Sequence, residues 1–455
     1  MEDSESVRGW PEVLSRLDRH GTSGLLAPDV ADLQELMQRY RVPGFSIAAG
    51  RLDGDMWCAG YGTIGAGRPD RVSCHTVFQA CSISKHVAAF GALRLVGDGV
   101  LELDADIDDY LTSWQLPASG GIWRPRVTLR QLLAHTAGLS YNWFRGYEAG
   151  ESAPSLLQTL RGEPPSNTPP VRPGLLPGSR FRYSGSHYAV LQQLMLDVTA
   201  APFDELMRTL VLDPAGMNDS SFSQRFPHQR AEPAALGHHV TGTPVPGGWR
   251  TLPEMAGAGL WTTPADLVRL ELEIARAAAG GSRLLGQDLA GQMLTAQAPG
   301  GMGLGTEVDT SGGYLRFGHT GSNVGYLCFS FAWPDTGAAV AVMANSEGAV
   351  EVLRSTLTAA ERRHAPSPDP AEAAPPAGLA GRYLLRENYP VDIGASDGRL
   401  TLTAAGQRPV DLLSQPGDRY QIPGLDCEIT FEDTGGPPVM HIRQDNTTQT
   451  ATREP

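Results

Sequence analysis

Strand-like apolar runs lie at both ends of the first 350 residues, and helical stretches fill the space between them. Strands are expected at 45–52, 56–62, 314–318, 325–333 and 338–344. Helices are expected at 29–40, 81–97, 191–199, 264–279 and 347–362. This order predicts an α/β fold in which one antiparallel sheet is closed by both ends of the segment and flanked by helices. The long middle portion then forms a helical subdomain.

A stretch rich in Pro and Ala at 363–377 has the composition of a linker. Short alternating runs beyond it predict strands at 382–385, 400–404, 419–422, 428–431 and 439–443. They indicate a small all-β barrel of the lipocalin-like kind. The chain is therefore expected to divide into an extension at 1–27, a catalytic domain at 28–362, the linker at 363–377 and the barrel at 378–455.

Charge and hydropathy exclude several function classes. The net charge of −14 disfavours nucleic acid and anionic membranes as partners. No stretch approaches the roughly 20 apolar residues of a membrane span. The segment Met1 to His20 has no apolar core of the kind that a secretory signal needs. We therefore expect a cytoplasmic protein that does not bind membranes.

The cysteines and histidines show no metal-binding pattern. Cysteines stand at 58, 74, 81, 328 and 427, without the short spacings of metal sites. We expect all of them to be free thiols in a reducing cytosol, with Cys81 serving only to pack the core. The pair His238-His239 has no neighbours that would complete a site. No metal or other cofactor is expected.

Lys85 is the only lysine of the chain, in which arginine supplies every other permanently charged cation. Arginine can replace lysine where only charge is needed, but guanidinium does not give up its proton. Ser82 precedes Lys85 by three residues, a spacing that places both side chains on one face of a helix. The Ser-x-x-Lys pattern is typical of a serine that forms an acyl-enzyme. A buried helix start would favour negative charge at Ser82, and burial would lower the pKa of Lys85.

Two further runs carry groups suited to proton transfer. Tyr183, in Phe181-Arg182-Tyr183-Ser184-Gly185, is expected in the loop before a helix at 188–199, where nearby cations could lower the pKa of its phenol. His319, in Gly318-His319-Thr320-Gly321-Ser322, is expected between two strands. The glycines of that run would let a substrate approach the strand edge. Each run alone is also compatible with a purely structural role.

The order of the three runs resembles the penicillin-binding-protein and class C β-lactamase superfamily over residues 28–362. Ser-x-x-Lys comes first, the Tyr-Ser-Gly of 183–185 stands for Tyr-x-Asn, and His-Thr-Gly stands for Lys/His-Thr/Ser-Gly. Further matches are Val42-Pro43-Gly44, His135-Thr136-Ala137-Gly138-Leu139, Asp213-Pro214-Ala215-Gly216-Met217 and Leu260 to Leu267. The resemblance implies a class C β-lactamase-like fold.

The resemblance also implies a role for each site residue. Ser82 would be the nucleophile, with Lys85 and Tyr183 as the general base pair and His319 in place of the third-motif cation. The N–H groups of Ser82 and Ser322 would form the oxyanion hole, and Gly321 would border the substrate. Gly185 departs from the asparagine that many members carry, and His319 departs from the lysine of true class C β-lactamases. Both departures weaken a β-lactamase reading without affecting acylation.

Three functions fit this acyl-enzyme. The preferred one is a stand-alone penicillin-binding-protein-type thioesterase, which would take a nonribosomal peptide from the phosphopantetheine of a peptidyl carrier protein. It would cyclise that peptide head to tail, favouring a D-configured C-terminal residue. The alternatives are a cytosolic hydrolase (an esterase, a D-amino-acid peptidase or a β-lactamase) and a receptor that stays acylated. Aromatic residues at 141–147, including Trp143, would suit a hydrophobic peptide or would pack the helical subdomain.

Overall fold

The structure is a computed structural model of the chain. It describes residues 30–54, 56–118, 122–297, 301–310, 313–364, 378–385, 390–396, 399–404, 409–415, 419–422, 427–432, 437–444 and 447–454. The chain divides into two compact units, one made of 1–308 with 316–364 and the other of 309–315 with 365–455. The expected extension at 1–27 and most of the expected linker, 365–377, lie outside the described residues.

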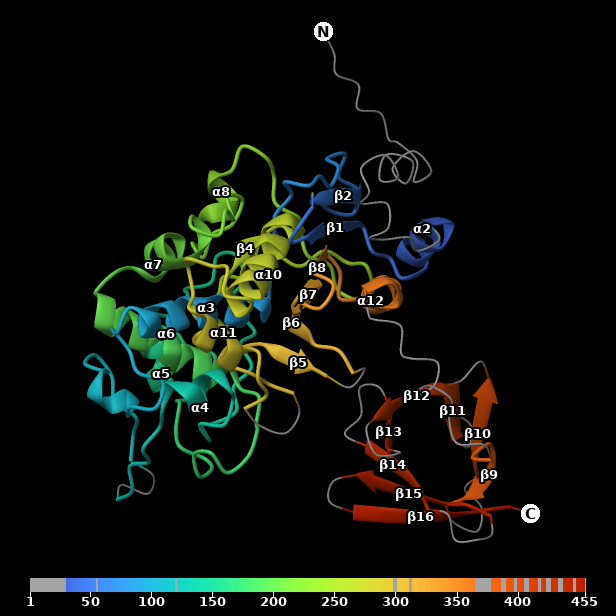
Figure 1. Cartoon of the computed structure of the whole chain (residues 1–455). Helices are drawn as coiled ribbons and strands as arrows, with labels where there is room; N and C mark the ends of the chain where they lie inside the picture. Colours follow the sequence, from blue (N-terminus) through green and yellow to red (C-terminus); the bar gives the residue numbers. More distant parts are fainter. Residues whose placement is uncertain are drawn as a thin grey trace. The chain divides into compact units, whose positions relative to one another are not determined.

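The larger unit contains the predicted sheet. Its six strands run in the order β2-β1-β8-β7-β6-β5, so that the first and last parts of the unit meet at the β1–β8 pair (Figure 1). The strands are β1 (Gly44–Arg51), β2 (Trp57–Gly62), β5 (Glu307–Asp309), β6 (Arg316–Asn323), β7 (Tyr326–Trp333) and β8 (Ala338–Ala344). Every pairing from β2 to β6 is antiparallel. The expected fold class is confirmed.

Helices cover the sheet on both faces. Helix α10 (Pro264–Ala278) packs on β1, β7 and β8, whereas α12 (Val350–His364) packs on β7 and β8 beside α2 (Val30–Arg39). Figure 1 shows α10 on one side of these strands and α12 with α2 on the other. Helix α10 begins where the side chain of Thr263 accepts the N–H of Asp266 and Pro264 occupies the first turn. Among the described residues, no helix has both the length and the apolar character needed to cross a bilayer.

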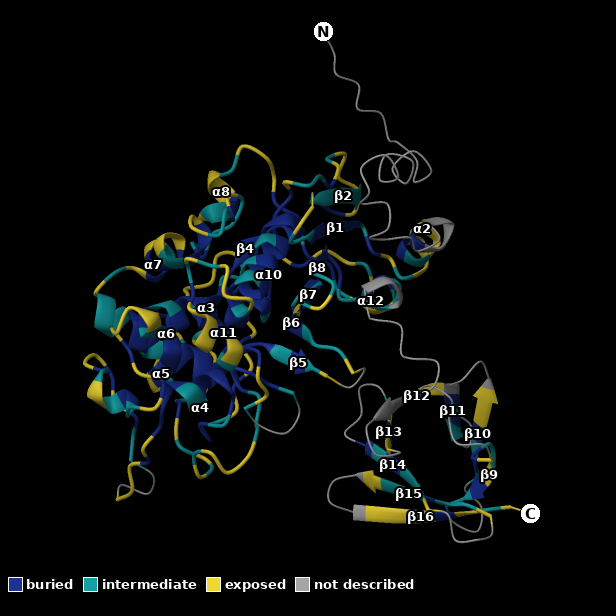
Figure 2. Cartoon of the chain, in the orientation of Figure 1, coloured by how far each residue is buried: buried dark blue, intermediate teal, exposed yellow. Residues whose placement is uncertain are grey.

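The middle of the larger unit is the helical subdomain. Its elements are α3 (Ile83–Gly97), η1 (Ile107–Asp109), α4 (Leu129–Leu133), α5 (Leu156–Arg161), α6 (Gly185–Thr199), α7 (Phe203–Met207), η2 (Arg208–Leu212), α8 (Phe226–Gln229), α9 (Met255–Ala258) and α11 (Gln287–Met293). The short strands β3 (Phe78–Gln79) and β4 (Trp261–Thr262) pair beside it. Helix α3 is buried on nearly every face, and it contacts α9, β6 and β7 (Figure 2). This helix therefore lies between the sheet and the rest of the subdomain.

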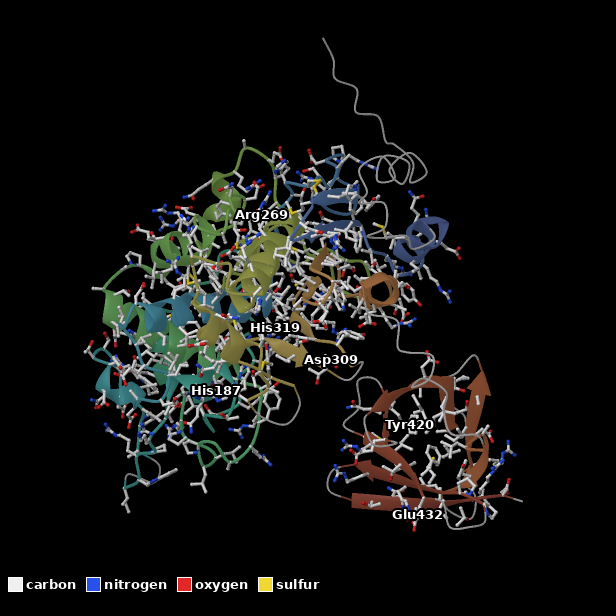
Figure 3. The ribbon with its side chains drawn as sticks, in the orientation of Figure 1. His187, Arg269, Asp309, His319, Tyr420 and Glu432 are labelled. Carbon is white, nitrogen blue, oxygen red and sulfur yellow. A yellow bond between two sulfur atoms is a disulfide. The ribbon has the colours of Figure 1, made fainter. Side chains whose placement is uncertain are left out.

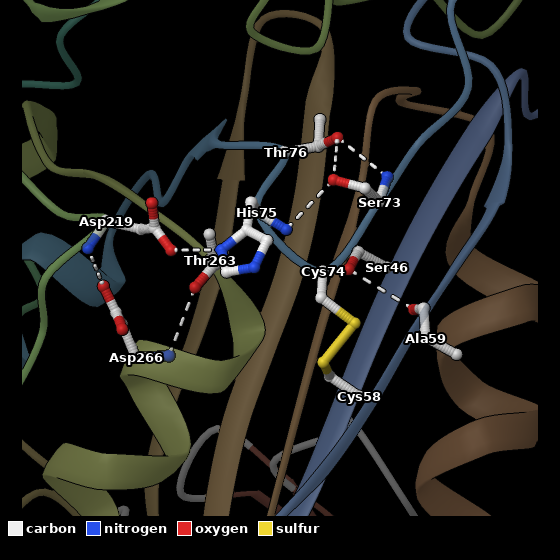
Figure 4. The surroundings of a disulfide bond; sticks show 10 residues. All are labelled: Ser46, Cys58, Ala59, Ser73, Cys74, His75, Thr76, Asp219, Thr263 and Asp266. Carbon is white, nitrogen blue, oxygen red and sulfur yellow. Dashed lines mark hydrogen bonds and ion pairs between the residues drawn. A yellow bond between two sulfur atoms is a disulfide. The ribbon is translucent and has the colours of Figure 1, made fainter. Parts of the chain in front are cut away.

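Two cysteines correct the expectation that every thiol is free. Cys58 in β2 and Cys74 form a disulfide with a Cα–Cα distance of 5.7 Å (Figure 4). The chain leaves β2 and folds back through an antiparallel bridge between Thr63 and Arg71, which brings the two cysteines into range. Their spacing of 16 residues carries no sequence signal for this pairing. The cysteines therefore do not argue for a reducing compartment.

The smaller unit contains a closed barrel of eight antiparallel strands, as predicted. The strands are β9 (Gly381–Leu384), β10 (Pro390–Ser396), β11 (Arg399–Ala404), β12 (Val410–Gln415), β13 (Arg419–Gln421), β14 (Cys427–Glu432), β15 (Val439–Gln444) and β16 (Thr447–Arg453). Its interior is filled by apolar side chains such as Tyr383, Ile429 and Met440. Figure 3 shows Tyr420 inside the barrel. Side chains fill this core, as in other small barrels.

Candidate active site

Ser82 stands at the N-terminus of α3, where a sharp bend of the chain presents it. Cys81 has a φ of 51°, in the left-handed region, and Ser82 follows as the first capping residue. Ser84 stabilises this bend, because its buried hydroxyl donates to the carbonyl of Cys81 at 2.6 Å and accepts the N–H of Leu260 at 3.0 Å. The sequence analysis missed Ser84, since a serine two residues after a nucleophile has no distinctive pattern.

Lys85 lies within hydrogen-bond distance of the candidate nucleophile. Its Nζ is 3.1 Å from Oγ of Ser82, and it donates a second hydrogen bond to the carbonyl of Gly257 at 2.7 Å. Burial lowers the pKa of Lys85 to about 7, in the predicted direction. A neutral amine is therefore well populated near pH 7, and its lone pair can accept the proton of the Ser82 hydroxyl. The carbonyl of Gly257 keeps the amine oriented.

Tyr183 completes the group around Ser82. Its ring centroid lies 5.1 Å from Nζ of Lys85. Burial raises the pKa of Tyr183, and a hydrogen bond to Ser82 opposes this effect only partly. The expectation that nearby cations could lower this pKa is therefore wrong, because burial of the phenol has the largest effect and raises it. Tyr183 lies two residues before α6, since that helix begins at Gly185 rather than at 188 and Ser184 caps it.

Two buried histidines support Tyr183 from behind. The ring of His135 lies 4.3 Å from the ring of Tyr183, centroid to centroid, and His135 Nδ1 lies 3.0 Å from His187 Nδ1. His135 Nδ1 accepts the N–H of Ser184 at 3.3 Å, so the shared proton must belong to His187. Burial lowers the pKa of His187 to about 3 and that of His135 well below its ordinary value. The pair is therefore neutral, and it fixes the tyrosine without adding charge.

The third motif lies within a strand, which corrects the expectation that it joins two strands. Gly318 to Ser322 belong to β6, which continues to Asn323 and pairs with β7. A side chain at Gly321 would place its Cβ 2.4 Å from Sγ of Cys328 and 2.6 Å from the carbonyl of Ala80. Glycine thus lets β6 pack directly against the bend that holds Ser82. The strand continues through the motif because no turn residue interrupts its pairing with β7.

His319 is buried, with one ring nitrogen in a hydrogen bond and the other buried without a partner among the described residues. Its Nδ1 contacts the carbonyl of Thr320, so this nitrogen carries the proton, and Oε1 of Glu307 lies 3.5 Å away. The other nitrogen, Nε2, has no hydrogen-bond partner among the described residues. Burial lowers the pKa of His319 to about 4, although Glu307 acts in the opposite direction. His319 is therefore neutral at pH 7 and presents a free lone pair at Nε2.

His319 lies near the tyrosine, with ring centroids 6.2 Å apart. Figure 3 marks His319 on β6 and His187 on the helical side. Ser322 lies three residues after His319 on β6 and is exposed, and Thr320 is exposed as well, as strand alternation requires. The geometry gives no further test of Ser322 as an oxyanion donor, and that role stays a prediction.

The aromatic segment at 141–147 contains both exposed and buried rings. Tyr141 and Trp143 are exposed, and Tyr141 lies close enough to Tyr183 to act on the pKa of that phenol. Phe144 and Tyr147 are buried, and they pack the subdomain. The packing role therefore holds for Phe144 and Tyr147, whereas Trp143 as a substrate contact stays a prediction.

Comparison with known proteins places this arrangement in context. The sequence profile of the Beta-lactamase family matches residues 31–363. The chain is 26% identical over 327 residues to penicillin-binding protein 4 of Amycolatopsis lactamdurans, which covers 68% of this chain and 82% of that protein. It is 30% identical over 224 residues to esterase EstB of Burkholderia gladioli, covering 44% and 52%. The crystal structure of SurE has a similar fold, with a TM-score of 0.59 at 24% identity, and covers 93% of this chain and 98% of its own.

Proposed function

Because the chain belongs to the Beta-lactamase family, we propose that it is a serine acyl transferase that cyclises peptides. The superfamily resemblance predicted from the motifs is confirmed by this membership, and the chain is a serine hydrolase of the β-lactamase and penicillin-binding-protein type. Its proposed substrate is a nonribosomal peptide held as a thioester on the phosphopantetheine of a carrier protein. The observation that carries the proposal is the 3.1 Å contact between Ser82 Oγ and Lys85 Nζ.

The acylation step follows from that contact. Neutral Lys85 accepts the hydroxyl proton as Oγ of Ser82 attacks the thioester carbonyl carbon. The C–S bond then breaks, and the leaving thiolate takes a proton that Tyr183 gives up and Lys85 replaces. The start of α3 and the edge of β6 supply N–H groups suited to the oxyanion. The products are an ester on Ser82 and a free thiol.

The second step transfers the acyl group to an amine. The N-terminal amine of the same peptide attacks the ester carbonyl, and its proton passes to a base within the site. His319 is suited to accept this proton, because its Nε2 is unprotonated and its ring lies near that of Tyr183. The C–O bond to Ser82 breaks, Oγ takes a proton from Tyr183 that His319 then replaces, and the product is a cyclic amide. An amine tethered in the acyl chain has a high effective concentration, which favours it over water.

One observation supports an apolar peptide as substrate, and another supports a D-configured C-terminal residue. The exposed ring of Tyr141 lies near Tyr183 and, with the exposed ring of Trp143 two residues further along the chain, offers an apolar surface to a peptide. SurE, which has a similar fold, has also been solved with D-Leu. Ester or amide hydrolysis is the alternative, and the similarity to esterase EstB favours it.

A synthetic peptidyl thioester tests the proposal. The probe is a peptide with a free N-terminus and a D-residue at its C-terminus, joined to N-acetylcysteamine. We expect an acyl adduct on the intact protein, detected by mass spectrometry, and mainly macrocycle as product. The Ser82→Ala variant should show no adduct, and an L-residue at the C-terminus should give little product.

The same assay separates the two readings. Acetylation of the peptide N-terminus should divert the acyl-enzyme to slow hydrolysis. If the free-amine peptide yields only linear acid, the chain is a hydrolase. Rapid cleavage of nitrocefin or a p-nitrophenyl ester, without turnover of peptidyl thioesters, would lead to the same conclusion.

A further inference from the structure

The ring of Phe144 lies directly against Gly185, two residues after Tyr183. A Cβ atom at position 185 would stand 2.5 Å from Cε2 of Phe144, 2.8 Å from its Cδ2 and 2.9 Å from the carbonyl oxygen of Asn142. The N–H of Gly185 donates to that same carbonyl at 2.9 Å, so the backbone has little room to move away. Phe144 therefore occupies the space into which any side chain at position 185 would begin to extend.

The same ring also reaches Gly257. A Cβ atom there would stand 3.5 Å from Cδ2 and Cε2 of Phe144, which is ordinary contact. The carbonyl of Gly257 is the one that accepts the hydrogen bond from Nζ of Lys85. Phe144 thus spans two backbone segments, one directly after the tyrosine and one that holds the lysine.

Phe144 differs in burial from its aromatic neighbours. It is 5% exposed, whereas Trp143 is 55% and Tyr141 is 64% exposed. The exposed rings are available to a substrate, while Phe144 fills the interior behind them. Its phenyl group offers no hydrogen bond to water or to a polar group of a substrate.

We propose that Phe144 determines whether the acyl-enzyme reacts with an amine or with water. The ring closes the space between Gly185 and Gly257, which keeps water away from the ester on Ser82 and leaves the peptide amine as the main nucleophile. The acyl groups that fit are those without a polar group on this side. The proposal rests on the acyl transfer proposed above.

Removal of the ring tests this role through a ratio of products. The probe is the N-acetylcysteamine thioester of N-acetyl-D-leucine, with glycinamide as the acceptor amine. Both products, the amide and the free acid, come from one acyl-enzyme, so their ratio does not depend on how much protein is folded. We expect Phe144→Ala to lower the amide-to-acid ratio by at least about threefold, because water gains access.

Phe203 offers a matched control. It is a buried ring in α7 that packs on Phe222 with a centroid distance of 5.2 Å. Phe203→Ala removes the same atoms from the core and should leave the ratio unchanged. An unchanged ratio in Phe144→Ala, or an equal fall in both variants, would overturn the proposal.

A second pair of variants tests the steric part. Gly185→Asn alone should lose the acyl adduct on Ser82, because its Cβ collides with Phe144. Adding Phe144→Ala should restore the adduct in part, since the collision with the ring is gone and only the 2.9 Å contact with the carbonyl oxygen of Asn142 remains. An adduct of full strength in Gly185→Asn, or no gain in the double variant, contradicts the proposal. If the wild-type protein forms no adduct, the proposed acyl transfer itself fails, whereas a normal adduct with an unchanged ratio rejects only the role of Phe144.

Discussion

The amine of Lys85 and the hydroxyl of Ser82 lie 3.1 Å apart because one turn of α3 joins the two residues. The N–H of Lys85 donates to the carbonyl of Ser82 at 2.9 Å and so begins the helix at this point. The only lysine of the chain thus lies where burial disfavours its charged form. That position explains why arginine, used everywhere else, does not replace it.

Lys85→Arg should be nearly as inactive as Lys85→Ala. The guanidinium group keeps the charge but does not accept a proton at a usable pH. Loss of a general base typically costs about 10²–10⁴ in rate. Thiol release from a peptidyl thioester measures the effect, with wild type as the reference. An arginine variant that keeps more than about a tenth of the wild-type kcat would show that Lys85 acts only through its charge.

Lys85→Met should stabilise the protein, and more so at low pH. Burial lowers the pKa of Lys85 to about 7 in the folded state, from its ordinary value of 10.5. Between pH 7 and pH 10.5 the unfolded chain therefore binds more protons than the folded chain. The free energy of unfolding of the wild type therefore rises with pH across this window, while the methionine variant lacks this term. Thermal melts at about pH 6 and about pH 10 should show the gain shrinking as pH rises. A gain independent of pH would mean that the amine is already solvated.

The pattern of apolar residues predicted the sheet, α3 and α10, because these elements depend on local periodicity. The spacing of Ser82 and Lys85 within one helical turn predicted that their side chains meet. The contacts that hold the site residues in place could not be predicted from these local patterns. Lys85 donates a hydrogen bond to the carbonyl of Gly257. Every residue type carries a backbone carbonyl, so the sequence does not show which one accepts this bond. The pairing of His135 with His187 joins residues 52 positions apart through the fold.

Some strands of the barrel could not be predicted from the sequence for a different reason. Strand β16, Thr447–Arg453, alternates few apolar residues and lies among the strands that were not predicted, with β10 and β12. Only one face of such a strand is buried, and Ala451 is the residue that fills the interior there. A small inward side chain produces little hydropathy contrast, so closure of the barrel becomes visible only in the pairing of β16 with β9 and β15.

Replacing both Cys58 and Cys74 with serine should destabilise the protein without affecting the chemistry. A disulfide that closes a loop of this length contributes about 3 kcal/mol by restricting the unfolded chain. The melting temperature should therefore fall, and a reductant should lower that of the wild type to the same value. Cys427→Ser is the control, because this cysteine lies in the barrel core and outside the Cys58–Cys74 disulfide, which is kept. Wild-type melting that does not respond to a reductant would contradict the pairing.

Deletion of residues from 366 onward should leave a folded, acylating protein. The larger unit has its own sheet and its own buried helix α3, and Ser82 and Lys85 both lie within it. Circular dichroism should show one cooperative melt, and intact-protein mass spectrometry should show the adduct on Ser82. A truncated protein that is insoluble would mean that the barrel contributes to the stability of the catalytic unit.

Glu307→Gln should slow the second step and spare the first. Oε1 of Glu307 accepts from the N–H of Thr320 at 2.9 Å and from its hydroxyl at 2.6 Å, and it lies 3.5 Å from Nδ1 of His319. Glutamine keeps an oxygen for these hydrogen bonds but removes the charge. The carboxylate raises the pKa of His319 against the effect of burial, so its loss makes Nε2 a weaker base.

An imidazolium formed when His319 takes the proton of the incoming amine also loses the carboxylate that stabilises it. One pKa unit corresponds to about a tenfold change in the proton-transfer equilibrium. We therefore expect an unchanged burst of thiol release, a slower appearance of macrocycle and an accumulating acyl-enzyme in Glu307→Gln. Glu351→Gln, on the exposed turn of α12 beside Arg354, should change neither step. If thiol release and cyclisation slow equally in Glu307→Gln, the carboxylate serves only to hold β6, and the proton of the amine must leave through Tyr183 or Lys85.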